Sequence, residues 1–124
     1  DHPQDFLAAF DVFCLPSYRE GFGTSVMEAA ACGVPALVSR IYGLTDAVSD
    51  GQTGLFHPTG DIEFIAKRLT QFAADGQLRQ KLGGNARRRV ELRYEESILV
   101  SEMTKFYKNL LQCVPGVAIT PNKV

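Results

Sequence analysis

The stretch Asp11–Ser39 reads DVFCLPSYREGFGTSVMEAAACGVPALVS and decides the fold. It holds two short apolar runs, 12–15 and 35–39, and such continuous runs are typical of strands that are buried on both faces. Between them, the segment 25–32 favours a helix that ends at Gly33, because glycine commonly follows the last turn of a helix. The stretch therefore predicts a strand, a helix and a second strand that runs parallel to the first.

The segments on either side of this stretch extend the same alternation. A short helical turn is expected over 5–10, another over 43–48, and a third strand over 53–57. Strands that alternate with helices at this spacing predict an α/β fold with a Rossmann-like parallel sheet of about three strands and flanking helices. Three strands make half of a doubly wound sheet. If 12–15 is the fourth strand of such a sheet, ligands bind beside it.

The rest of the chain predicts helices, the first of them capped by Asp61. Apolar residues recur at helical spacing in three stripes: Ile62, Ile65, Leu69, Phe72 and Ala73; Leu78, Leu82, Ala86 and Val90; and Leu99, Met103, Phe106 and Leu110. The last stripe is expected to pack in a core or against another domain. The predicted organisation is one partial domain over 1–111 and a tail over 112–124.

Composition and charge limit the possible partners. A chain of 124 residues with a net charge of −1 lacks the excess of Lys and Arg that nucleic-acid binding requires. Its three cysteines have no metal-ligand spacing, which predicts reduced thiols in the cytoplasm. No apolar run approaches the roughly 20 residues that span a bilayer.

Basic residues gather in the predicted helices: Arg79, Lys81, Arg87, Arg88, Arg89 and Arg93. They could attach the protein peripherally to anionic lipid at the inner face of a membrane. Acidic residues interrupt the run, so a solvated helix surface is the preferred interpretation. His2 and His57 lack a partner at ligand spacing and are expected to be structural.

The turn after the first strand is the candidate site. Gly21 and Gly23 permit backbone geometries that other residues avoid, and the helix that follows directs its N-terminal amides toward the same space, which suits a phosphate. Glu20 and Glu28 supply carboxylates that can accept hydrogen bonds from sugar hydroxyls. Two structural alternatives stay open: Ser25 and Glu28 also form a capping-box pattern, and Glu20 could be an exposed turn residue.

This turn and its flanks resemble the retaining glycosyltransferases of the GT-B fold, in particular the large family 4 group. The resemblance rests on the two glutamates with seven residues between them, on the glycines around Phe22, and on the later motif Asp50-Gly51-Gln52-Thr53-Gly54. It implies the second half of a GT-B C-terminal domain, which binds the nucleotide-sugar donor. It also implies that a separate N-terminal domain, absent from this chain, supplies the acceptor site.

The resemblance assigns roles to the residues of the turn. Glu20 is the implied catalytic residue and binds hydroxyls of the donor sugar. The backbone amides that face the sugar and its β-phosphate are implied to be those of Gly21, Phe22 and Gly23. The neighbouring Arg19 receives no role.

Two further residues complete the implied donor site. Thr24 lies beside the diphosphate and Glu28 holds the ribose hydroxyls. No metal or organic cofactor is implied, and the expected substrates are a nucleotide-diphosphate sugar, with uridine as the expected base, and a saccharide or lipid-linked acceptor. Many relatives have a Gly-Gly pair and an acid where this chain has Tyr42-Gly43 and Asp46, so Asp46 is expected only at a helix start.

A non-catalytic module is the alternative to an enzyme fragment. A Rossmann-like half-domain could serve nucleotide binding, or oligomerisation through its uncovered sheet edge. Under either hypothesis an exposed edge strand predicts self-association of this chain. Because the implied N-terminal domain and the first half of the sheet are absent, the chain alone is expected to be inactive.

Overall fold

The computed structural model describes residues 2–112. The chain divides into two compact units, 1–92 and 93–124, which are described separately. The domain limits 1–111 and 112–124 stay predictions, and most of the expected tail lies outside the described residues.

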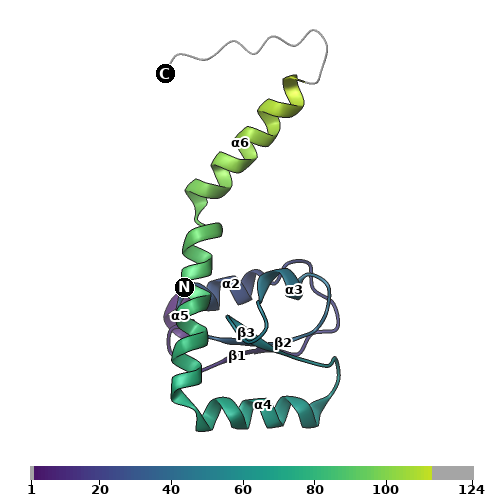
Figure 1. Cartoon of the computed structure of the whole chain (residues 1–124), viewed down its shortest axis with the longest axis vertical. Coiled ribbons are helices and arrows are strands. Elements are labelled where there is room, and N and C mark those ends of the chain that lie inside the picture. Colours follow the sequence, from purple (N-terminus) through teal and green to yellow (C-terminus); the bar gives the residue numbers. More distant parts are fainter. Residues whose placement is uncertain (1, 113–124) are drawn as a thin grey trace. The chain divides into compact units, whose positions relative to one another are not determined.

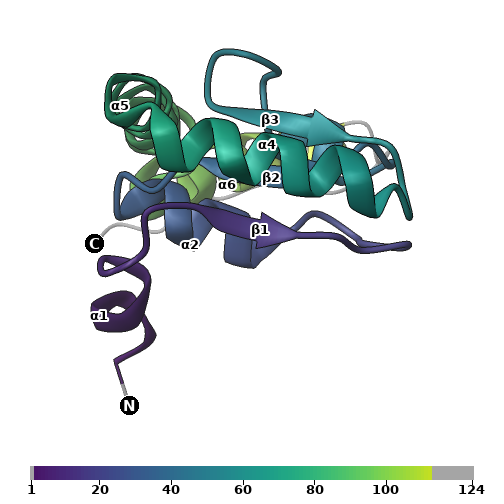
Figure 2. The same cartoon turned by 90° about the horizontal axis from the view of Figure 1, so that it is seen from below.

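A three-stranded parallel sheet forms the centre of the first unit. Its strands are β1 (Phe13–Leu15), β2 (Ala36–Ser39) and β3 (Gly54–His57), in the order β1-β2-β3. Ala36 lies opposite Phe13 on one side and Gly54 on the other. The arrowheads of β1 and β3 point the same way in Figure 2. The structure therefore confirms the three predicted parallel strands.

Helices cover both faces of this sheet. The helices α2 (Thr24–Ala31) and α3 (Leu44–Ala47) lie on one face, and α4 (Ile62–Ala74) lies on the other (Figure 1). Both crossovers step in the same direction along the sheet, so crossovers of one hand place both helices on one face. This arrangement confirms the Rossmann-like α/β prediction.

The first helix differs from its expected position. The helix α1 spans Pro3–Leu7, whereas the sequence predicted a turn over 5–10. Proline suits the first helical position because its φ is already helical and its missing N–H has no partner there. Leu7 is buried in a cluster with Ala29 and Val34, which holds α1 on the unit.

The edge strand β1 is less buried than expected. All of its residues, Phe13–Leu15, are half-buried, whereas every residue of β2 is buried. Within the described residues β1 pairs with β2 alone, so its outer edge has no neighbouring strand. The prediction of a strand buried on both faces is therefore wrong for β1 in this chain.

The core on the α4 face combines the sheet with two helices. Leu37 and Leu55 from the sheet pack with Phe72 of α4 and Leu82 of α5 (Gly76–Arg93). The Oδ1 atom of Asp61 accepts a hydrogen bond of 2.9 Å from the N–H of Phe64, which confirms the predicted cap.

The apolar stripe of α4 is narrower than predicted. Ile62 is 79% exposed, Leu69 is 38% exposed and Ala73 is also exposed, so the stripe prediction is wrong at these three positions. The buried face of α4 is centred on Phe72, with Ile65 packed against the same cluster.

The second unit contains α6 (Glu96–Gln112), which has no buried residue. The predicted stripe residues are exposed: Leu99, Met103, Phe106 and Leu110. The rings of Phe106 and Tyr107 meet edge to face with centroids 5.7 Å apart. Between residues 2 and 112, no helix has the length and apolarity needed to cross a bilayer.

Candidate functional site

The predicted site lies at the carboxyl edge of the sheet, in the turn between β1 and α2. Gly23 adopts the left-handed region with φ +71° and occupies the N-cap position of α2. A Cβ on Gly23 would lie 2.5 Å from Cδ2 of Leu44. Both the backbone angle and the packing against α3 therefore require glycine at this position.

Gly21 behaves differently from Gly23. Its φ lies outside the left-handed region, so Gly21 does not use the backbone freedom that the sequence offered there. A Cβ built on Gly21 would meet no atom within 4 Å. The turn is therefore open at Gly21, and a bound group could approach the backbone there.

The helix start is not a capping box. Because Gly23 is the N-cap and no side chain caps α2, Ser25 and Glu28 lie within the helix, and that alternative is wrong. The N–H groups of Val26 and Met27 bond to the carbonyl oxygen of Gly23. No group in the described part of the chain accepts from the N–H of Thr24 or Ser25. Two free amides therefore remain at the helix start.

Glu20 is held by a neighbouring side chain. The Ser17 Oγ donates a hydrogen bond of 2.8 Å to Oε1 of Glu20. Glu20 is half-buried, so it is not a freely exposed turn residue. This bond leaves the Oε2 atom of Glu20 without a partner among residues 2–112, and therefore able to accept from a ligand.

Glu28 lies farther along the helix than expected. Because α2 begins at Thr24, Glu28 is in the second turn and not the first. Thr24 and Glu28 are both exposed, and residues four apart lie on one face of a helix. The open face of α2 therefore presents the hydroxyl of Thr24 and, one turn later, the carboxylate of Glu28.

A second loop packs directly on this turn. Gly43, with φ +89°, precedes α3 and lies against the backbone of the turn. A Cβ there would lie 2.8 Å from the carbonyl oxygen of Glu20 and closer still to that of Gly21. The two loops at the carboxyl ends of β1 and β2 are therefore in close contact.

The two loops together form a pocket of about 240 Å³. Its lining residues are Tyr18, Arg19, Glu20, Ile41 and Tyr42. The structure thus brings Glu20 together with four residues that received no site role from the sequence: Tyr18, Arg19, Ile41 and Tyr42. For Arg19, its position next to Glu20 was the available signal.

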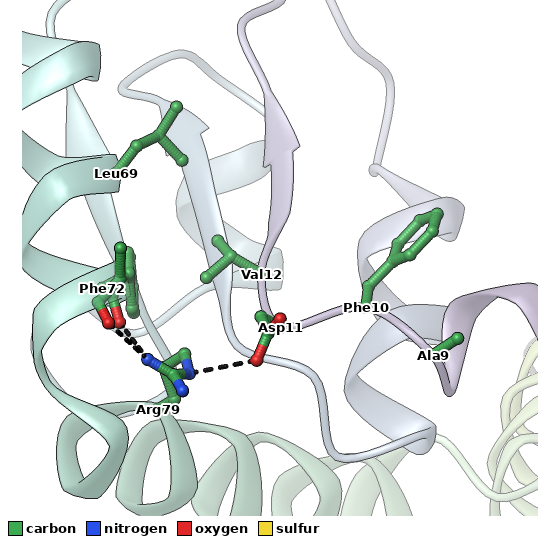
Figure 3. Close-up of a pocket in the computed structure, with 8 residues that line it drawn as sticks. Ala9, Phe10, Asp11, Val12, Leu69, Phe72 and Arg79 are labelled. Atoms are coloured by element: carbon green, nitrogen blue, oxygen red, sulfur yellow. Dashed lines mark hydrogen bonds and ion pairs between the residues drawn. The ribbon is translucent and has the colours of Figure 1, made fainter.

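A larger cavity of about 520 Å³ lies elsewhere, beside Asp11, Val12 and Phe72 (Figure 3). Arg79 is one of its lining residues, donating to the carbonyl oxygens of Phe72 and Ala73 and pairing with Asp11 at 3.3 Å. This cavity is at the amino end of β1, whereas open parallel sheets bind ligands at the carboxyl ends of their strands. We therefore place the candidate site at the smaller pocket.

Half of the basic run makes contacts within the protein. Arg79 binds the end of α4, Arg87 pairs with Glu91 at 2.9 Å, and Arg89 donates to the carbonyl oxygen of Asp46 at 2.8 Å. Asp46 lies in the first turn of α3, as predicted. Four residues of the run are exposed, which agrees with a solvated helix surface: Lys81, Arg87, Arg88 and Arg93. Arg79 and Arg89 are half-buried and bond to backbone carbonyl groups, which gives them a structural role.

The buried histidine and the cysteine of β1 give no second site among residues 2–112. His57 is buried, with Nδ1 2.8 Å from the carbonyl oxygen of Pro58 and Nε2 3.5 Å from Oγ of Ser39. Burial raises the pKa of the Cys14 thiol, which disfavours its reactive thiolate form. Among the described residues, no three His, Cys, Asp or Glu side chains cluster in a way that could hold a metal ion.

Sheet, turn and open helix start define a Rossmann-like domain with an open turn between β1 and α2 at its carboxyl edge. The family described as "Glycosyl transferases group 1" matches residues 1–89, and the chain belongs to this family. The predicted GT-B family resemblance is therefore confirmed.

Known relatives agree with this assignment. The chain is 34% identical over 110 residues to the capsular polysaccharide biosynthesis glycosyltransferase CapM of Staphylococcus aureus, covering 89% of this chain and 29% of CapM. Sucrose-phosphate synthase from Thermosynechococcus elongatus matches with a TM-score of 0.83 and 32% identity, over 88% of this chain and 27% of that one. The chain thus spans less than a third of the length of these relatives.

A third similar protein has been solved with a bound nucleotide. A mutant of S. aureus TarM, in complex with Fondaparinux, alpha-GlcNAc-glycerol and UDP, matches with a TM-score of 0.75 and 28% identity. The match covers 83% of this chain and 21% of that chain.

Proposed function

We propose that this chain is part of the donor-binding domain of a retaining glycosyltransferase. The enzyme transfers a sugar from a nucleotide-diphosphate sugar, with uridine as the expected base, to a saccharide or lipid-linked acceptor. The observation that carries the proposal is the open start of α2, where the N–H groups of Thr24 and Ser25 are free and Glu20 lies in the adjoining turn. Family membership and the UDP bound to TarM support it.

Each residue of the turn has a role in this proposal. The free amides and the positive end of the α2 dipole bind the β-phosphate, while the open backbone at Gly21 and the amides of Phe22 and Gly23 allow close approach. Glu20 accepts hydrogen bonds from hydroxyls of the donor sugar.

The outer face of α2 serves the nucleoside in this proposal. Glu28 accepts hydrogen bonds from the ribose hydroxyls, and Thr24 contacts the diphosphate at the helix start. Both side chains are exposed on one face of α2, one turn apart, which suits a ligand that extends along the helix.

Chemistry at this site consists of positioning and charge stabilisation. As the bond between the sugar and the β-phosphate breaks, negative charge develops on the leaving diphosphate. Amides already oriented at the helix start stabilise this charge without reorganisation. The leaving phosphate takes the proton of the attacking acceptor hydroxyl, so the site requires neither a protein nucleophile nor a metal.

The test is transfer by the full-length protein. UDP-glucose, UDP-galactose, UDP-GlcNAc, UDP-GalNAc and GDP-mannose are offered with saccharide and lipid-linked acceptors. We expect transfer from one of these donors. We also expect Glu28→Ala to raise the Kd of the donor by at least about tenfold, because the substitution removes the carboxylate that accepts hydrogen bonds from the ligand. Glu63→Ala, at an exposed glutamate of α4, is the matched control. No transfer, or equal donor affinity in both variants, contradicts the proposal.

Self-association is the second candidate function, favoured by one observation. The outer edge of β1 has no partner strand among residues 2–112, and such an edge can pair with another chain. Sedimentation velocity of the 124-residue chain tests this. A concentration-dependent dimer supports edge pairing, and a monomer at all concentrations contradicts it.

We also propose a cytoplasmic location, with peripheral attachment to the inner face of the membrane as the alternative. The free thiols of Cys14 and Cys32 support a reducing compartment. Cell fractionation distinguishes the two locations.

A further inference from the structure

We propose that Tyr42 and Arg19 complete the sugar pocket of Glu20 and determine which donor sugar is accepted. Tyr42 packs on the apolar face of the pyranose ring, and Arg19 donates hydrogen bonds to the ring hydroxyls. This inference rests on the proposed function, because it takes the ligand of Glu20 to be the donor sugar.

The size of the pocket favours a single sugar ring. Its volume of about 240 Å³ is below the roughly 300–1,000 Å³ of pockets that enclose a complete drug-sized ligand. The free amides at the start of α2 lie outside its lining residues. The diphosphate and the sugar therefore have separate places, which meet at the turn.

The polar groups of the pocket are available to a ligand. Arg19 makes no hydrogen bond or ion pair with any residue in the described range, and it is not paired with the adjacent Glu20. Glu20 has one oxygen bound by Ser17 and the other free. A guanidinium only donates and a carboxylate only accepts, whereas a sugar hydroxyl does both. This pair therefore suits neighbouring hydroxyls of one ring.

Tyr42 supplies an apolar wall whose backbone is fixed. The residue is 88% exposed, so the ring has little contact with the protein and can cover a ligand. The next residue, Gly43, packs on the carbonyl groups of Glu20 and Gly21, which sets the position of Tyr42 relative to Glu20. Ile41 lines the same pocket. Covering these apolar groups with the C–H face of a sugar is favourable.

The test compares the donor with its nucleotide alone. Isothermal titration calorimetry measures the Kd of two ligands for the full-length protein. The first is the one of the five nucleotide sugars named above that binds most tightly, and the second is its nucleotide, UDP or GDP. We expect Tyr42→Ala to raise the Kd of the nucleotide sugar by about tenfold, the loss expected for one aromatic contact, with little change for the nucleotide. Tyr42→Phe keeps the ring and retains affinity.

Arg19 is tested in the same way. We expect Arg19→Gln to weaken binding of the nucleotide sugar but not of the nucleotide. Arg88→Gln, at an exposed arginine of α5, should leave both affinities unchanged. Arg19→Gln is also expected to change the order of preference among the five sugars.

The outcomes separate this inference from the proposed function. If the wild type binds neither a nucleotide nor any nucleotide sugar, the proposed function is wrong and this inference falls with it. If the wild type binds, but Tyr42→Ala and Arg19→Gln match it or weaken nucleotide and nucleotide sugar equally, the proposed function stands and this inference is overturned.

Discussion

Gly43 lies so close to the carbonyl oxygen of Gly21 that no side chain fits between them. This contact joins the loop that follows β2 to the turn that follows β1. The contact also sets the distance between Tyr42, which precedes Gly43, and Glu20, which precedes Gly21. These two residues therefore line one pocket. The geometry of the candidate site therefore depends on a glycine that offers no functional group.

The first prediction concerns this contact. We expect Gly43→Ala to lower the melting temperature of the full-length protein, because alanine meets both the cost of a sparsely populated backbone conformation with positive φ, about 1–3 kcal/mol, and a clash with two carbonyl groups. Gly51→Ala is the control, since Gly51 has φ +69° with open space around its Cβ position. Differential scanning calorimetry should show the larger shift for Gly43→Ala. Equal shifts would mean that the backbone angle alone accounts for the effect.

The second prediction concerns the support of Glu20. We expect Ser17→Ala to weaken nucleotide-sugar binding by up to about tenfold, because it removes a hydrogen bond to a carboxylate that holds the side chain in place. Affinity for the nucleotide without its sugar should stay unchanged. Titration calorimetry measures both, with Ser49→Ala, at a loop serine bonded to Gln52, as the control. An unchanged affinity for the nucleotide sugar would contradict a positioning role for Ser17.

The third prediction concerns Arg79. Its guanidinium binds the last carbonyl groups of α4 and pairs with Asp11, so it links α5, α4 and the start of β1. We expect Arg79→Met to destabilise the protein by about 1–3 kcal/mol, since partly buried carbonyl groups lose their donor. Arg87→Met removes an exposed helix pair and should cost no more than about 0.5 kcal/mol. Urea unfolding followed by circular dichroism compares the two, and similar losses would count against the link.

The fourth prediction concerns the start of α4. We expect Asp61→Ala to destabilise the protein by about 1 kcal/mol, because the N–H of Phe64 loses its capping acceptor. Asp61→Asn keeps an acceptor oxygen and should restore most of this stability in the same urea unfolding assay. If Asn and Ala behave alike, the cap contributes through charge and not through the hydrogen bond.

Much of the fold follows from local patterns in the sequence. The three strands and α2 lie within a residue or two of their predicted places, because continuous apolar runs and a glycine stop are local signals. The Asp61 cap was predicted for the same reason. The burial of β1 was not predicted correctly, because it depends on a neighbouring strand that residues 2–112 do not supply.

The site was harder to predict because its geometry comes from contacts between distant segments. The Ser25–Glu28 pattern suggested a capping box, yet Gly23 can adopt a left-handed angle and start the helix earlier. Nothing local to Tyr42 indicates that it shares a pocket with Arg19. That proximity follows from the packing of Gly43 on the turn, which sequence spacing does not reveal.

The buried His57 lies at the carboxyl ends of β2 and β3, and its ring can report by NMR whether water reaches this end of the sheet. A carbonyl oxygen can only accept, so the close contact with Pro58 requires the hydrogen of the ring on Nδ1. Because the ring is shielded from water, that hydrogen should exchange slowly with solvent and give a separate downfield proton resonance. The protein thus carries its own NMR reporter at the ends of β2 and β3, which needs no added label to show whether a substitution in the neighbouring loops has opened the sheet to water.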